Sequence, residues 1–250
     1  MYPILFVISG TPIYASPVFL ALALMTGFIV GRREIRRRDI PLQVYILYWL
    51  CAVPIALLLA ALNSALFQQR LLEVLSHPAQ LTSTGLVSFG AVIGTLSLGY
   101  GIAKLYNLPR GQILDVIALL LPLILGVYRI GCILNGCCHG LETDSLFGFY
   151  LPDISGRWAH RYPTQIALLS FDFGLFFWLW KWRLNEPAEG KITLAFLLSF
   201  SIFRLLLDSL RELPMVTEGL NILQVGSITL LVLTLYTWAM IQLRKNDRYS

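Results

Sequence analysis

The residues best suited to chemistry lie in one segment, Tyr128 to Gly140, which reads YRIGCILNGCCHG. Arg129 and Asn135 stand there among glycines, at the end of a long apolar run. A guanidinium offers a planar fork of N–H donors that grips a phosphate at two points, and glycines let backbone amides approach an anion closely. This pattern favours a site for a phospholipid headgroup. The alternative is an arginine that only reaches from a helix end to the membrane surface.

A second charged pair lies within a later apolar run. Arg204 and Asp208 are four residues apart, so on a helix they share one face and can form an ion pair. Charged groups inside a membrane are costly and usually face a polar cavity. The pair predicts either a second phosphate ligand, Arg204, held by Asp208, or an ion pair that only joins helices. For Asp115, in an earlier run, the structural alternative is favoured: a polar contact between helices or a charge at a helix N-terminus.

Three cysteines and a histidine resemble a set of metal ligands at first sight: Cys132, Cys137, Cys138 and His139. Their spacing is neither that of a zinc finger nor that of a paired-cysteine knuckle, and adjacent cysteines do not easily bind one ion. The sequence favours packing thiols first, a disulfide from Cys132 to Cys137 or Cys138 second, and a metal site last. His139 and His160 are candidate bases near neutral pH, although a loop histidine is usually only solvated.

The elements that must position these residues follow from the composition. Of the 250 residues, 57% are hydrophobic and 13% charged, and the mean hydropathy is +0.71. A soluble globular chain has about 45–50% apolar and roughly 25% charged residues. The composition therefore argues against a soluble enzyme, a disordered chain, a coiled coil and a disulfide-rich secreted domain. The continuous apolar runs also differ from the alternating strands of a membrane β-barrel. We expect an all-α integral membrane protein.

A membrane-spanning helix needs about 20 apolar residues, and the sequence contains seven candidate spans. We expect one membrane domain over residues 1–250, with a longer loop at the outer face at about 132–163. The predicted spans are Ile13–Gly31, Leu42–Leu62, Leu86–Ala103, Gln112–Tyr128, Thr164–Lys181, Ile192–Leu210 and Ile222–Leu243.

Basic residues predict the orientation. Five arginines follow the first span, between Arg32 and Arg38. Placing them in the cytoplasm puts thirteen basic residues inside and five outside, the latter being Arg70, Arg129, Arg157, Arg161 and Arg211. Because cytoplasmic loops carry the excess of Lys and Arg, the N-terminus is expected outside and the C-terminus in the cytoplasm. The net charge of +5 then reflects membrane topology and not nucleic-acid binding. No basic segment precedes the first apolar run, so no cleaved signal peptide is expected.

Four blocks, which occur along the chain in the family's order, resemble the prolipoprotein diacylglyceryl transferase family. One of them, Arg129 to Gly140, is similar to that family's signature, G-R-x-G-N-F-x-N-x-E-x-x-G. In addition to the four blocks, Gly27 to Arg38 resembles the end of the family's first span and its basic loop. The other blocks are Leu114-Asp115 through Pro122-Leu123, which resembles the stretch before the signature; Pro163-Thr164-Gln165, which resembles H-P-[ST]-Q; and Ile202-Phe203-Arg204 with Asp208 and Arg211, which resembles F-R-x-x-x-E-x-x-R.

The resemblance implies a reaction. Members of the family move the diacylglyceryl group of phosphatidylglycerol onto the lipobox cysteine of a prolipoprotein, in a bacterial inner membrane, and glycerol phosphate leaves. No metal and no organic cofactor is implied. By resemblance, Arg129 binds the lipid phosphate and Arg204 assists the leaving phosphate. Asp208 takes the place of the family's glutamate, while Asn135 and Gly140 shape the headgroup site.

The chain departs from the family's pattern at several positions. Cys132 and Cys137 replace the first asparagine and the glutamate of the signature, which is typical of a cysteine-rich branch with C-x-x-x-G-C-C-x-G. The family's S-F-H-G-G block corresponds to Ser88-Phe89-Gly90-Ala91, which has no histidine, and Tyr162 replaces the histidine before Pro163. We therefore hypothesise that His139 or His160 acts as the base.

Two other functions compete with this interpretation. One is a lipid-binding or transport homologue that keeps the phosphate site and has lost catalysis. The other is a phospholipid-headgroup transferase that uses the same arginines with a different acceptor. Transporters usually carry charged residues at the midplane and broken helices in both halves. The clustering of Arg129, Asn135 and His139 at the outer side favours an interfacial enzyme.

Overall fold

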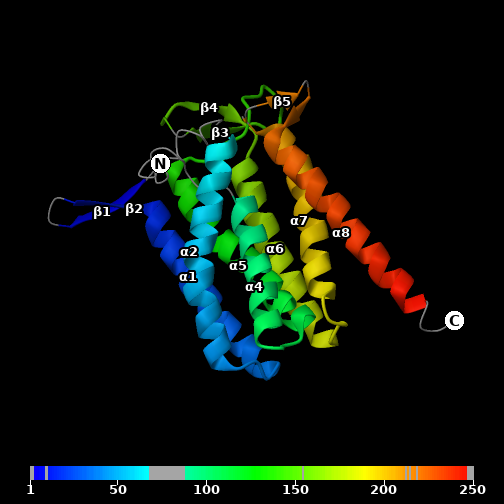
Figure 1. Ribbon diagram of the computed structural model, residues 1–250. Coiled ribbons are helices and arrows are strands. Elements are labelled where there is room, and N and C mark those ends of the chain that lie inside the picture. Colours follow the sequence, from blue (N-terminus) through cyan, green and yellow to red (C-terminus); the bar gives the residue numbers. More distant parts are fainter. Residues whose placement is uncertain are drawn as a thin grey trace.

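The computed structural model describes residues 3–8, 11–67, 88–153, 155–211, 213, 215–217 and 219–246. Long helices run roughly side by side, and short hairpins gather near one of their ends (Figure 1). Arg70 and His77 lie outside the described residues. The long helices are α1 (Ala15–Arg37), α2 (Leu42–Phe67), α4 (Ser88–Leu105), α5 (Arg110–Asn135), α6 (Thr164–Trp182), α7 (Lys191–Leu207) and α8 (Ile222–Asn246), and 3-10 turns follow α6 (η2, Arg183–Asn185) and α7 (η3, Asp208–Leu210).

The all-α membrane architecture is confirmed, because each of the seven predicted spans lies largely within one of these helices. The start of the span predicted from Leu86 lies outside the described residues, and the span predicted from Ile13 begins in a strand and becomes helical only at Ala15. Among the described residues, six helices are long and apolar enough to cross a membrane. The helix outside that set is α6, which carries Gln165, Asp172 and Lys181 among its apolar residues. The chain is thus a multi-pass membrane protein.

Three two-stranded hairpins depart from an all-helical chain. They pair β1 (Ile4–Ile8) with β2 (Thr11–Tyr14), β3 (Phe149–Pro152) with β4 (Trp158–Arg161), and β5 (Met215–Thr217) with β6 (Leu220–Asn221), all antiparallel. The second hairpin has aromatic residues in its strands and Gly156 in its turn at φ +84°. Aromatic strands and a glycine at positive φ both favour a hairpin. A search of the sequence for apolar runs of about 20 residues does not detect such short strands.

Helix α5 is seven residues longer at its C-terminus than the predicted span, and this corrects the placement of the signature. Arg129, Cys132 and Asn135 lie within the helix and not in the outer loop. The helix ends only where Gly136 adopts a left-handed conformation at φ 68°, since glycine accepts that conformation without a steric cost. The loop predicted to lie at the outer face therefore begins after Asn135 and not at about residue 132.

The core is built around α5, which is buried over most of its length, from Ile113 to Cys132. Helices α1 and α6 pack along α5, whereas α2 packs mainly along α4, and α7 packs along α8. A helix that is apolar on all sides belongs in the interior. The functional segment therefore extends from the most buried helix of the protein.

At the end of the helices away from the second hairpin, buried carboxylates hold the bundle together. Glu34 is 1% exposed and pairs with Arg38 at 2.8 Å and with Arg183 at 3.1 Å, so segments far apart in sequence meet there. Asp115 accepts hydrogen bonds from the backbone N–H groups of Gly190 and Thr193. It therefore satisfies donors at the N-terminus of α7, and the predicted structural role of Asp115 is confirmed.

Gly90 lies where α2 and α4 touch most closely. A Cβ atom added there would lie 2.2 Å from the carbonyl oxygen of Leu59. The close approach of the helices requires glycine, as the spacing of Gly90 and Gly94 suggests. Gly90 occupies the histidine position of the S-F-H-G-G block, so helix packing in this chain closes that position to any side chain.

We expect Gly90→Ala to destabilise the protein by about 1–3 kcal/mol, because a backbone carbonyl cannot move aside for the methyl group. Gly101→Ala is the matched control, since it lies on the same helix and an added Cβ meets no described atom within 4 Å. Thermal unfolding in detergent micelles measures both variants. Equal melting temperatures would show that the two helices are not in tight contact at Gly90.

Candidate functional site

Two buried arginines from different helices converge on one carboxylate. Arg129 of α5 is 6% exposed and Arg204 of α7 is 2% exposed. Asp172 of α6, itself buried, lies 3.5 Å from Nε of Arg129 through Oδ2 and is within electrostatic range of Arg204. The two guanidinium groups also lie within electrostatic range of each other. The structure therefore brings together the two arginines singled out in the sequence.

Asp208 fixes Arg204 as the spacing predicts. Its Oδ2 lies 3.0 Å from Nη2 of Arg204, and its Oδ1 accepts a hydrogen bond from Nη1 of Arg211 at 3.0 Å. Asn221 donates to the backbone carbonyl of Asp208 at 2.7 Å. Asn221 and Gln224 also exchange side-chain to backbone hydrogen bonds at the start of α8, which is a capping box. The predicted ion pair is confirmed, within a network that ties α7 to α8.

Asp172 is the site residue that the sequence reasoning missed. It is a single carboxylate in the middle of the predicted span Thr164–Lys181. A lone acid within a span requires a cationic partner, so its position was a usable signal. Without Asp172, the buried guanidinium of Arg129 would lose its carboxylate partner, whereas Arg204 would keep Asp208.

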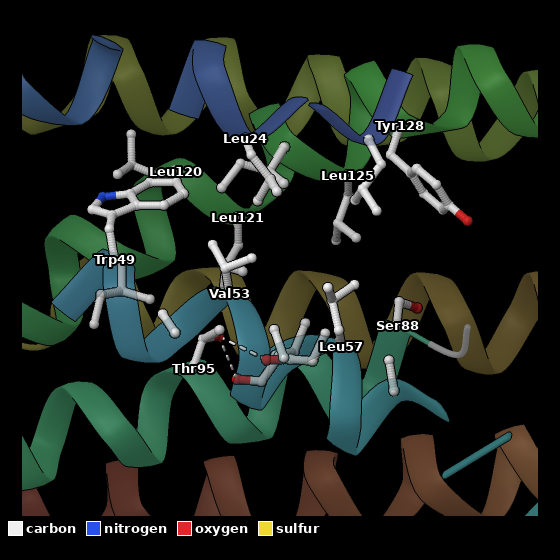
Figure 2. A pocket seen from close by; sticks show the side chains of 18 of the residues that line it. Leu24, Trp49, Val53, Leu57, Ser88, Thr95, Leu120, Leu121, Leu125 and Tyr128 are labelled. Atoms are coloured by element: carbon white, nitrogen blue, oxygen red, sulfur yellow. Dashed lines mark hydrogen bonds between the residues drawn. The ribbon is translucent and has the colours of Figure 1, made fainter. Parts of the chain in front are cut away.

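An apolar cavity of about 130 Å³ opens beside Arg129. It is enclosed by side chains of α1, α2, α4 and α5 (Figure 2). Leucines, valines and alanines provide most of its wall. Trp49 lies toward one end of the view, while Ser88 and Tyr128 lie toward the other, and Arg129 completes the lining next to Tyr128. The cavity is thus apolar along its length, and Arg129 places a positive charge at one end.

Three thiols form a cluster that contacts Arg129. The sulfurs of Cys132, Cys137 and Cys138 all lie within 4.8 Å of one another. The thiol of Cys138 accepts a hydrogen bond from Nη1 of Arg129 at 3.5 Å. All four cysteines are free in the structure. The sulfurs of the adjacent Cys137 and Cys138 lie close together, with Cys138 in a left-handed conformation at φ 63°.

Neighbouring groups favour a thiolate at Cys138. The neighbouring thiols of Cys132 and Cys137, together with the positive charges of Arg211 and Arg129, hold the pKa of Cys138 well below its usual range. Thr164 and Gln165, from the P-T-Q block, donate hydrogen bonds to the backbone carbonyls of Cys138 and Cys137 at 2.9 and 2.7 Å. That block therefore fixes the turn that carries the thiols.

Asn135 and Gly140 border the site in different ways. Nδ2 of Asn135 donates to Oγ of Ser16 at the start of α1, and its buried Oδ1 has no hydrogen-bond partner among the described residues. Gly140 is buried, and a Cβ there would lie 2.4 Å from the carbonyl oxygen of Tyr162. Gly140 therefore allows a close contact with the backbone of Tyr162. Asn135 has a buried side-chain oxygen that can still accept a hydrogen bond.

The two histidines lie in different surroundings. His139 directly follows the thiol cluster and is half-buried. His160 is exposed on β4, and its ring lies 5.5 Å from that of Tyr150. Among the described residues, no hydrogen bond or ion pair joins His160 to either buried arginine. The geometry thus favours His139 over His160 as a group near the site.

Arg161, next to His160, fastens the β3–β4 hairpin. It is 1% exposed and lies 3.0 Å from both Glu142 and Asp153. The hydroxyl of Ser155 holds the pKa of Asp153 at about 2, with help from the charge of Arg161. Because this folded-state pKa is depressed, the contribution of Asp153 is present above the ordinary carboxyl pKa near 4 and is lost as the pH falls toward 2. The β3–β4 hairpin is thus stabilised by ion pairs at neutral pH.

Together these features can bind an amphipathic anion. The apolar cavity suits an acyl chain, and the two guanidinium groups suit a phosphate. The three thiols lie beside Arg129, and His139 follows them in the chain. Charge developing on a departing phosphate would meet fixed positive groups in a site of low dielectric constant, where such stabilisation is strongest.

Comparison with known proteins gives a consistent result. A family model described as prolipoprotein diacylglyceryl transferase matches residues 3–240. A phosphatidylglycerol–prolipoprotein diacylglyceryl transferase 2 of Clostridium perfringens is 37% identical over 142 residues, 54% of each chain. Similarly named proteins of Clostridioides difficile and Geobacillus kaustophilus are 25% and 29% identical over about nine tenths of this chain (89% and 90%) and 88% and 87% of their own.

We expect Asp172→Ala to destabilise the protein by about 3–5 kcal/mol, because it leaves two buried guanidinium groups without their shared counter-ion. Asp172→Asn keeps the shape of the side chain but removes its negative charge. Its melting temperature should therefore show whether the charge or the packing of Asp172 stabilises the protein. Asp144→Ala, at an exposed loop position, is the control and should change stability by less than about 0.5 kcal/mol. A melting temperature for Asp172→Ala equal to that of the control would refute the role of Asp172.

Proposed function

The chain belongs to the prolipoprotein diacylglyceryl transferase family, and on that premise we propose that it transfers the diacylglyceryl group of phosphatidylglycerol to the lipobox cysteine of a bacterial prolipoprotein. The observation that carries the proposal is the apolar cavity that ends at Arg129, with Arg204 held nearby across Asp172. In this proposal an acyl chain lies in the cavity and the phosphate binds at the two guanidinium groups.

The packing of the helices supports sideways entry of the lipid. Helix α1 packs mainly on α5 and α2 packs mainly on α4, and the cavity lies between these two pairs. A lipid therefore enters from the outer leaflet at the seam between α1 and α2. The prolipoprotein presents its cysteine at the same face of the membrane, beside the thiol cluster.

The reaction forms one bond and breaks one. The acceptor sulfur, as a thiolate, attacks the glycerol carbon that carries the phosphate. The C–O bond breaks, and its electron pair leaves with glycerol phosphate. Arg129 binds the phosphate, and Arg204 stabilises the added charge as it departs. Asp208 orients Arg204, while Asn135 and Gly140 border the headgroup. The proton of the acceptor thiol passes to His139 or to water.

We place the protein in the bacterial cytoplasmic membrane with the N-terminus outside and the C-terminus inside. The ion pairs support this orientation, because Arg38 and Arg183, both predicted to be cytoplasmic, share Glu34 at one end of the bundle. Arg161 and Arg211, both predicted to be outside, lie on segments joined by residues 140–142 at the other end. The site then faces the outer side, where the lipobox cysteine is presented.

The test is incubation of the purified protein with labelled phosphatidylglycerol and a lipobox peptide. A thioether product and free glycerol phosphate are expected. Lipid binding without turnover would instead support a lipid-binding or transport protein. Turnover only with another acceptor would support a different headgroup transferase. Either of these results contradicts the proposal.

Arg129→Lys keeps the positive charge beside Asp172 but loses the two-point grip on phosphate. We expect kcat/KM to fall by about 10²-fold or more, with little loss of stability. Arg157→Lys is the matched control, because Arg157 lies on the outer hairpin and its side chain is 67% exposed. If the two variants keep the same kcat/KM, Arg129 does not bind the reacting phosphate.

His139→Ala and His160→Ala separate the two candidate bases. We expect His139→Ala to lower kcat and His160→Ala to leave it unchanged, because only His139 adjoins the thiol cluster. The measurement is the initial rate of thioether formation near pH 7. Full activity in both variants would reject a histidine base altogether.

A further inference from the structure

The cysteine cluster has the shape of a metal site with three sulfur ligands. Its sulfurs lie within 4.8 Å of one another, and sulfurs bound tetrahedrally to one zinc ion are about 3.8 Å apart, given Zn–S bonds of about 2.3 Å. Each sulfur therefore needs to move by only about half an ångström. Cys132 is on the last turn of α5, and Cys137 and Cys138 are on a turn fixed by Thr164 and Gln165.

The cluster coincides with the departures from the family signature. Cys132 and Cys137 stand where that signature has asparagine and glutamate, and the histidine of the S-F-H-G-G block is replaced by Gly90, where no side chain fits. The chain has thus lost polar groups suited to proton transfer. It has gained soft sulfur ligands in contact with Arg129, the proposed phosphate ligand.

We propose that Cys132, Cys137 and Cys138 bind a zinc ion, and that the fourth position of the ion takes the thiol of the acceptor cysteine. This inference rests on the proposed function. Zinc sites that act in catalysis use three protein ligands and leave one position open. A thiol that coordinates zinc loses its proton outright. The ion thus promotes deprotonation of the acceptor thiol, which a general base would otherwise bring about.

Charge and ligand chemistry favour zinc. Thiolate ligands select zinc or monovalent copper over harder ions. Three thiolates and one Zn²⁺ carry a net charge of −1, and the guanidinium of Arg129, 3.5 Å from the Cys138 sulfur, attracts this charge while it also pairs with Asp172. The positive end of the lipid site and the negative metal site therefore stabilise each other. The acceptor sulfur would be held beside the phosphate that must leave.

The step balances without any oxidant or reductant. The acceptor R–SH releases one proton to water or to His139 and binds the ion as R–S⁻. The sulfur then forms a bond to the glycerol carbon, and the C–O bond to phosphate breaks. Glycerol phosphate leaves with the electron pair. The thioether has no negative charge and dissociates from the ion, while the three enzyme thiolates remain bound.

Co²⁺ is a suitable probe, because its thiolate complexes are coloured. The full-length protein in micelles should bind one Co²⁺ with sulfur-to-metal absorption bands, and Zn²⁺ should displace it. A lipobox peptide should shift these bands, whereas the same peptide with serine in place of cysteine should not. Cys137→Ser should abolish the bands. Cys51→Ser, on α2 away from the cluster, is the control and should keep them.

Activity gives a second readout. Removing the ion with a chelator should lower the rate of thioether formation about 30-fold at pH 7, because an unassisted thiol with a pKa near 8.5 is then only about 3% ionised. Adding Zn²⁺ back should restore the rate. In the wild-type protein, Zn²⁺ should also protect three of the four thiols from alkylation, with Cys51 left reactive, so the test does not depend on a variant that folds.

Two results would overturn the inference and leave the proposed function standing: full activity in protein that binds no Co²⁺ or Zn²⁺, and full activity after chelation of a bound ion. A disulfide between two cysteines of the cluster in fully active protein would likewise overturn the zinc inference and leave the proposed function standing. Metal binding without thioether formation on any lipobox peptide would instead refute the proposed function, and with it the catalytic role of the ion.

Discussion

The structure depends on the burial of two guanidinium groups in the interior of the helix bundle. Arg129 and Arg204 are each almost inaccessible to solvent, and Asp172 and Asp208 supply the negative charge that makes this possible. Such groups are stable inside a bilayer only when they are paired or face a polar site. Helices α5, α6 and α7 must therefore stay in register at this level. The same constraint keeps a strong anion site ready beside an apolar cavity.

Close helix contacts place that cavity. Gly90 lets α4 approach the backbone of α2, which brings Phe89 to 5.4 Å from the guanidinium carbon of Arg204 and Ser88 to the cavity wall. In the family pattern this block carries a histidine. In this chain it contributes packing, and three thiols lie close together at the end of α5 and in the turn that follows it.

The sequence predicts the helices and the charged pair well, because both follow from local patterns. Apolar runs locate all seven helices, and the four-residue spacing of Arg204 and Asp208 predicts their contact. The approach of Asp172 to Arg129 depends on how α6 packs on α5, which no local pattern encodes. The convergence of Cys137 and Cys138 depends on one left-handed residue. Spacing rules assume ordinary backbone conformations and therefore pointed away from this cluster.

The most direct test of the account is a double-mutant cycle on kcat/KM with Arg129→Lys and Arg204→Lys. If both guanidinium groups act on one phosphate, the double variant should lose less than the two single effects combined, with a coupling of about 1 kcal/mol or more. This coupling should exceed the coupling measured on stability with the same four proteins. Effects that add within about 0.3 kcal/mol would show that the arginines serve separate sites and would contradict the account.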